Sequence, residues 1–178
     1  NIPRLVYQSC MRSTFCFLSM LLCVLCGSTD AEAKKPNIIF IMADDLGWTE
    51  LGSYGQKIIK TPYLDQLALE GMRFTSNYSG NAVCAPSRCV LMTGKHPGHA
   101  FVRDNKAAKP EGQHPIPDSE VTIGELLQKE GYTTGAFGKW GLGNTWSTGN
   151  PTKQGFNRFF GFNCQAHAHS YYLSLIHI

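Results

Sequence analysis

The chain has 178 residues, a length that fits a single domain, and its 43% apolar and 16% charged residues are typical of a globular protein. This composition excludes a wholly disordered chain. The formal net charge is +3 and the basic residues are scattered, so the sequence predicts neither a nucleic-acid interface nor a membrane-surface patch.

The first 33 residues have the features of an export signal. Met11 and Arg12 precede an apolar run at 15–26, and the small-residue sequence Ala-Glu-Ala follows at 31–33. This order is that of a secretory signal peptide, and the run is shorter than the roughly 18 residues of a membrane-spanning helix. We therefore expect cleavage before Lys34, no membrane span, and a secreted, periplasmic or lysosomal product. A lipoprotein anchor is the alternative.

Residues 37–42 form a continuous apolar run rich in β-branched side chains, as in a strand buried on both faces. Asp44 and Asp45 follow this run almost directly. Open α/β sheets bind ligands at the carboxyl ends of their strands, so we expect the two carboxylates to lie at a binding site. A solvated turn is the alternative.

Two helices are marked by the residues at their ends. Thr61 and Pro62 are expected to start a helix that ends at about residue 71. Thr122 and Glu125 form a capping box at the start of a second helix, which Gly131 ends.

Two further strands are predicted at 72–78 and 132–137, the second leading into Lys139. Together with the run at 37–42, they give the order strand, helix, strand, helix, strand. This order predicts an α/β fold with a largely parallel sheet.

The segment around Cys84 combines a cysteine, a proline and an arginine at close spacing. We expect Pro86 to fix a turn and a helix to begin near Ser87, which holds Cys84 at the helix mouth. Backbone N–H groups and Arg88 favour negative charge there, so the place suits an oxyanion. A buried cysteine beside a surface arginine is the alternative.

Three cysteines follow the expected cleavage site: Cys84, Cys89 and Cys164. An odd number in an exported protein leaves at least one thiol unpaired within the chain. A cysteine-phosphatase loop is disfavoured, because it would need arginine at the position of Val90.

Residues 84–94 resemble the signature of the sulfatase family, C-x-P-S-R followed by two residues, two apolar positions, Thr and Gly. The strand before Asp44 and the segment 131–140 match in the same order, and the resemblance covers residues 34–172. The finer likeness is to the arylsulfatase and N-acetylgalactosamine-6-sulfatase branch. The resemblance implies the N-terminal portion of an alkaline-phosphatase-like α/β sandwich with a largely parallel central sheet.

The resemblance also implies a mechanism for hydrolysing organic sulfate esters. A formylglycine-generating enzyme would oxidise Cys84 to an aldehyde, 3-oxoalanine (formylglycine). The aldehyde hydrate offers one hydroxyl to attack sulfur and a second to release sulfate. The implied calcium ligands are Asp44, Asp45 and the group made from Cys84, since hard oxygen ligands suit Ca²⁺. Arg88 would hold the hydrate and Lys139 would bind a sulfate oxygen, so that Cys84, Arg88 and Lys139 form the catalytic set.

The sequence departs from the family pattern at Gly141, where many members have a histidine. Either another residue takes the proton-handling role or this branch of the family works differently, and we assign His167 and His169 to substrate binding. Exposed loop histidines are the alternative. Further metal ligands of the family lie much farther along its chains, so we expect this chain alone not to complete the site.

We divide the chain into upstream and signal residues at 1–33, the N-terminal part of a sulfatase catalytic domain at 34–172, and an unmatched tail at 173–178 that we interpret as a truncation artefact. Two other functions fit the same residues. One is a phosphodiesterase or phosphonate monoester hydrolase of the same superfamily, and the other is a non-catalytic exported fragment. The sequence does not identify the sulfate ester.

Overall fold

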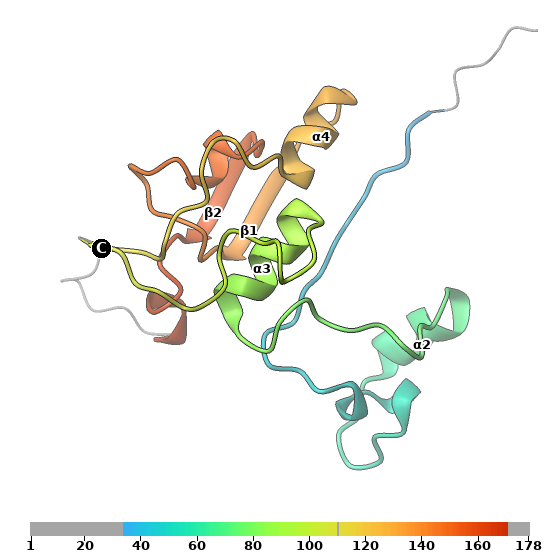
Figure 1. The fold of residues 1–178 in the computed structure, drawn as a ribbon. Coiled ribbons are helices and arrows are strands. Elements are labelled where there is room, and N and C mark those ends of the chain that lie inside the picture. Colours follow the sequence, from blue (N-terminus) through green and yellow to red (C-terminus); the bar gives the residue numbers. More distant parts are fainter. Residues whose placement is uncertain (1–33, 110, 171–178) are drawn as a thin grey trace, which may run out of the picture. The chain divides into compact units, whose positions relative to one another are not determined.

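The computed structural model describes residues 34–109 and 111–170 (Figure 1). The predicted signal peptide and the tail at 173–178 lie outside the described residues. The chain divides into a first unit that ends at Met42 and a second that begins at Ala43. Among the described helices, none has the length and apolar character needed to cross a membrane.

Residues 37–42 of the first unit are not a strand in this structure, and the prediction of a buried strand there is wrong. Ile39 and Ile41 are each 85% exposed. A strand buried on both faces needs neighbours that pair with its N–H and C=O groups and layers that cover its side chains. The described residues of the first unit contain no such neighbour.

In the second unit, helix α2 spans Pro62–Glu70 and confirms the first predicted helix. Its N-cap residue Thr61 makes no side-chain cap, and its hydroxyl instead accepts a hydrogen bond of 2.8 Å from the Gly52 N–H. That bond ties the helix start to a single-turn helix, η2, at Gly52–Tyr54.

The strand predicted at 72–78 is also absent. These residues are irregular, with Phe74 61% and Tyr78 85% exposed. An apolar, β-favouring sequence makes a strand when a partner strand supplies hydrogen bonds, and these residues pair with none of the described strands. The short helix η1 at Trp48–Glu50 completes the elements of this part of the chain.

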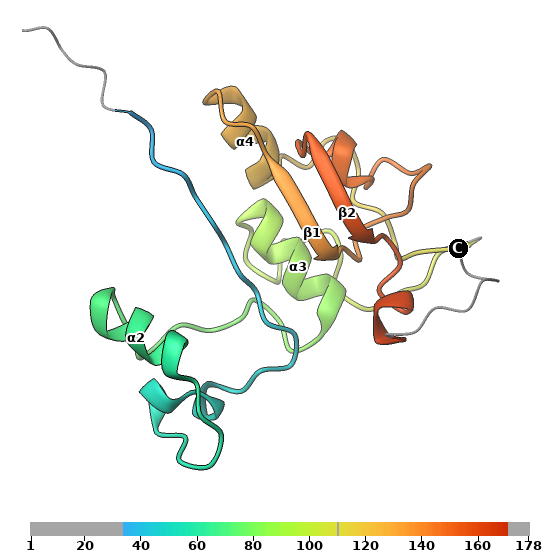
Figure 2. The same ribbon diagram turned by 180° about the vertical axis from the view of Figure 1, so that it is seen from behind.

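The sheet consists of two parallel strands, β1 at Gly135–Lys139 and β2 at Arg158–Phe162, seen side by side in Figures 1 and 2. Strand β1 starts later than the predicted 132–137 and ends at Lys139. Strand β2 was not predicted. The parallel pairing agrees with the expected α/β class, and the connection between the strands contains the short helix η3 at Pro151–Lys153.

Helix α4 spans Ile123–Lys129 and starts with the predicted capping box. The Thr122 hydroxyl accepts the Glu125 N–H at 3.3 Å, and the Glu125 carboxylate accepts the Thr122 N–H at 2.8 Å. Both views of the ribbon place α4 and α3 on the β1 side of the strand pair (Figures 1 and 2).

Helix α3 spans Cys84–Thr93, so it begins three residues before the expected start near Ser87. Pro86 lies within its first turn. The backbone nitrogen there has no partner inside the helix, so proline is compatible with the position. Cys84 is therefore the first helical residue rather than part of a preceding turn.

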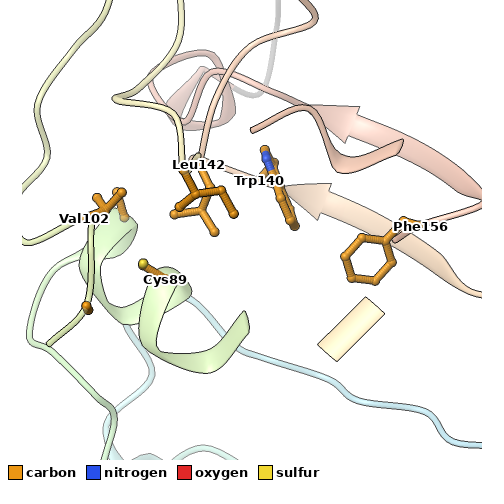
Figure 3. Close-up of a cluster of buried hydrophobic side chains, with 8 residues drawn as sticks. Cys89, Val102, Trp140, Leu142 and Phe156 are labelled. Carbon is orange, nitrogen blue, oxygen red and sulfur yellow. The ribbon is translucent and has the colours of Figure 1, made fainter. Parts of the chain in front are cut away.

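A cluster of buried side chains joins α3 to the segment after β1 (Figure 3). Its members are Ala85, Cys89, Ala100, Val102, Ile116, Trp140, Leu142 and Phe156. The Trp140 indole meets Phe156 edge-on at 5.7 Å between ring centroids, and its N–H donates to the Gly149 carbonyl at 2.7 Å. This packing brings the start of α3 to the carboxyl end of β1.

Candidate active site

Cys84 lies at the first position of α3, with its Sγ 3.3 Å from the Lys139 Nζ. The thiol is partly exposed, and the three cysteines of the described chain, Cys84, Cys89 and Cys164, are all free. A group carried on Cys84 is thus both open to solvent and next to a cation.

The ammonium of Lys139 is the centre of the site. Its Nζ lies 2.6 Å from Asp44 Oδ2, 3.3 Å from Cys84 Sγ and 3.0 Å from His169 Nε2. An ammonium has three N–H donors and no acceptor, so these contacts occupy all of them. In this arrangement the His169 Nε2 accepts from the ammonium.

Arg88 links three parts of the site. It is 9% exposed, its Nη1 donates to the Lys139 carbonyl, and its Nη2 lies 3.2 Å from Asp44 Oδ1. The arginine therefore fixes the end of β1 to α3 and shares the Asp44 carboxylate with Lys139. A planar guanidinium holds such a geometry better than a flexible ammonium does.

The two cations keep Asp44 charged. The hydrogen bond from Lys139 is the main reason that the pKa of Asp44 lies below its usual value; the charges of Lys139 and Arg88 add to this effect and burial opposes it. Burial is the largest influence on the pKa of Lys139 and lowers it. Hydrogen bonds and charges from Asp44 and Cys84 outweigh burial, so the net pKa of Lys139 is raised. Both groups are ionised at neutral pH.

A residue that the sequence did not mark supports the start of α3. The N-cap Val83 has no capping side chain, and the Ala85 N–H donates to Asn105 Oδ1 at 2.9 Å. Asn105 lies in the irregular segment after α3, and no motif singles it out. Its role depends on a contact between residues twenty positions apart.

The structure brings together five of the seven residues selected from the sequence: Asp44, Cys84, Arg88, Lys139 and His169. Asp45 is not among the residues whose ligand atoms lie close enough to share a metal ion. Its φ of 57° is left-handed, and no other non-glycine residue of the described chain has a positive φ. His167 lies elsewhere, with its Nδ1 3.4 Å from Glu111 Oε1.

The ligand atoms of Asp44, Cys84 and His169 lie within 4.8 Å of one another, which is compatible with a metal ion. Oxygen, sulfur and nitrogen together do not form the all-oxygen set that calcium prefers. Replacing the Cys84 sulfur by oxygen would bring this set of ligand atoms closer to the one that calcium prefers. The Asp44 oxygens now face Arg88 and Lys139, so a metal would share that carboxylate with them.

Residues 36–172 match the family model described as Sulfatase. The chain belongs to the sulfatase family. Among its curated relatives are arylsulfatase D of Homo sapiens, 39% identical over 154 residues, and N-acetylgalactosamine-6-sulfatase of Rattus norvegicus, 44% identical over 138 residues. These alignments cover 80% and 74% of the chain, and 26% of each relative.

Solved sulfatase structures share the fold. Ps i-CgsB is 40% identical with a TM-score of 0.68, covering 74% of this chain and 29% of that one. The PsFucS1 sulfatase from Pseudoalteromonas sp. is 32% identical with a TM-score of 0.63, covering 92% and 31%. This confirms the predicted alkaline-phosphatase-like α/β fold. The chain spans about a quarter of the length of the curated relatives that it matches.

Proposed function

We propose that the complete protein hydrolyses organic sulfate esters and that Cys84 is the source of its nucleophile. One observation carries the proposal: the cysteine of the sulfatase signature starts α3 with its Sγ 3.3 Å from the Lys139 ammonium. The family membership supports the reaction class, and arylsulfatases and carbohydrate sulfatases are both among the curated relatives.

Conversion of Cys84 to formylglycine would supply the reacting group, whose hydrate offers two hydroxyls. A generating enzyme would have to act before folding, because Cys84 is helical in the folded chain and its neighbours Ala85 and Pro86 are buried. The modifying partner is thus expected to read an extended segment.

Lys139 would bind a sulfate oxygen and Arg88 would hold the group on Cys84. All three Lys139 donors are occupied by Asp44, Cys84 and His169, so an incoming oxygen has to replace one of these acceptors. Whichever acceptor is replaced, Arg88 keeps its bond to the Lys139 carbonyl and so maintains the spacing between α3 and β1.

Asp44 and Asp45 are the residues of the described chain that we propose for Ca²⁺, together with the oxygen formed at Cys84. A calcium ion there would stabilise negative charge on the reacting oxygens. Asp45 is exposed and directly follows Asp44 in the chain. We further propose export through the signal at 1–33, to a secreted, periplasmic or lysosomal location.

Mass spectrometry tests the modification directly. Trypsin cleaves after Arg73 and Arg88, so Cys84 and Cys89 fall in separate peptides. After coexpression with a generating enzyme, we expect the peptide at 74–88 to lose about 18 Da, since oxygen replaces H₂S, and to react with a hydrazide. The peptide at 89–95 is the internal control and should keep its mass.

Turnover by the complete protein tests the reaction class. We expect release of sulfate from an aryl or sugar sulfate, with much slower release of phosphate from the matching phosphate ester. A preference for phosphate diesters or phosphonate monoesters would contradict the proposal and favour another hydrolase of the superfamily. An unmodified Cys84 thiol in an enzyme with ordinary sulfatase activity would contradict the proposed nucleophile.

A further inference from the structure

Residues 140 and 141 continue the pairing of the strands beyond β1. The Trp140 N–H donates to the Phe162 carbonyl at 2.9 Å and the Gly141 N–H to the Asn163 carbonyl at 3.1 Å. Gly141 has a φ of 84°, and a Cβ built on it would lie 2.8 Å from Gln165 Oε1. A side chain at position 141 would therefore have to push aside the amide end of Gln165.

Gln165 is fixed in this place from its other side as well. It is 4% exposed, and its backbone N–H donates to the side-chain oxygen of Gln113, itself 5% exposed, at 2.8 Å. Its own Oε1 is buried without a hydrogen-bond partner among the described residues, as is the Arg88 Nε. A buried unpaired amide oxygen lowers stability, so this side chain is not explained by its contribution to folding.

The chain that Gln165 anchors leads directly to the site. The short helix η4 spans His167–His169, and the His169 Nε2 lies 3.0 Å from the Lys139 Nζ. Fixing Gln165 against Gly141 limits where a residue four positions later can lie. An anion that replaces Asp44 or Cys84 at the Lys139 ammonium comes to lie next to His169, because the ligand atoms of these three residues lie within 4.8 Å of one another.

We propose that Gly141 and Gln165 form a positioning pair that holds His169 against Lys139, where His169 contacts the bound sulfate group. The pair acts through backbone placement, since Gln165 fills the space beside Gly141 and thereby sets the path into η4. The proposal rests on the proposed function for the identity of the anion, but the coupling between positions 141, 165 and 169 does not depend on it.

The first test is Gly141→Ala in the complete protein with ¹⁵N-labelled histidine, read from the His169 Nε2 resonance, which His169→Gln assigns. The added methyl should displace Gln165, shift that resonance and weaken binding of inorganic sulfate about threefold or more. Gly131→Ala is the matched control, because Gly131 has a φ of 80° with nothing within 4 Å of an added Cβ. It carries similar backbone strain without the clash.

The second test is a double-mutant cycle. Gln165→Ala should itself shift the His169 resonance and weaken sulfate binding. In the Gln165→Ala protein, Gly141→Ala should add no more change than Gly131→Ala does, because the side chain with which it clashes is gone. Equal effects of Gly141→Ala and Gly131→Ala, or an effect of Gly141→Ala that persists in full without Gln165, would overturn the positioning pair.

The two proposals fail in different ways. If the cycle shows coupling but the complete protein releases no sulfate from esters, the proposed function is wrong and the pair stands, and titration with inorganic phosphate would show which anion the site takes. If sulfate esters are hydrolysed and His169 does not respond to either variant, the pair is wrong and the proposed function stands.

Discussion

Helices α2 and α3 have nearly the same length, 9 and 10 residues, yet only α3 contributes buried side chains. Its buried residues are Ala85, Pro86, Arg88 and Cys89, whereas α2 has none. The ends of α2 were recognisable in the sequence, whereas α3 begins three residues before its expected start near Ser87. End signals placed α2, but they do not reveal whether a helix carries part of a core or a site.

The contacts of the two helices explain the difference. Arg88 of α3 bonds to the carbonyl of Lys139, 51 positions away, and the Ala85 N–H bonds to Asn105. The side-chain bonds at the start of α2 reach back only to the segment at 52–53. A site needs groups from distant segments, and α3 is the helix that such segments meet.

The largest effect that we expect comes from substitution of Cys84. Cys84→Ala in the complete enzyme should abolish turnover, because no nucleophile can form. Cys84→Ser should leave at most a very slow enzyme, since its single hydroxyl can take up sulfate but lacks the second hydroxyl that releases it. Steady-state rates would measure both variants, and intact mass would detect a trapped sulfate ester on the Cys84→Ser protein.

Cys89→Ala is the control for these variants, because Cys89 lies five residues along the same helix and is fully buried. It should retain turnover at a modest loss of stability. Equal loss of activity in the Cys84 and Cys89 variants would mean that helix packing, rather than the group at position 84, decides the rate.

The next largest effect concerns the core beside α3. Leu142→Ala removes a side chain that is 0% exposed, and we expect it to lower the free energy of unfolding by about 2–5 kcal/mol. Leu67→Ala on α2 makes the same chemical change at a side chain that is 64% exposed, and we expect a change of about 0.5 kcal/mol or less. Denaturant titration measures both, and similar values would refute the contrast between the core beside α3 and the exposed surface of α2.

The capping box of α4 should contribute less than the core. Thr122 is fully buried, and its hydroxyl accepts the Glu125 N–H and donates to the Gln154 carbonyl at 2.7 Å. Thr122→Ala should lower the free energy of unfolding by about 1–2 kcal/mol. Thr122→Ser, which keeps the hydroxyl, should recover most of that loss in the same titration.

The smallest of these effects is expected at Asn105. Asn105→Ala removes the acceptor of the Ala85 N–H, and we expect a loss of about 1 kcal/mol because water can reach part of this helix end. Asn105→Asp keeps an acceptor near the helix N-terminus and should be close to wild type. Amide hydrogen exchange at Ala85 would show the effect locally, and unchanged protection in Asn105→Ala would contradict the assigned bond.

Local sequence signals predicted α2, α4 and the place of Lys139 at a strand end, because capping residues and strand ends are set by neighbours in the chain. The predictions at 37–42 and 72–78 failed because a strand requires a partner strand, and neither described strand pairs with these two segments. Strand β2 was missed because it contains Gly161, and glycine is uncommon in strands. Only its pairing with β1 makes these five residues a strand.

The sequence by itself determined the family, the identity of Cys84 as the distinctive residue, and the charged groups Asp44, Arg88 and Lys139 that now surround it. These depend on residue type and spacing along the chain. Only the tertiary structure decided that His169 and not His167 meets Lys139, and that Gln165 lies over Gly141. The reason is physical: these pairs lie 24 or more positions apart, and chain packing rather than local spacing brings them within a few ångströms.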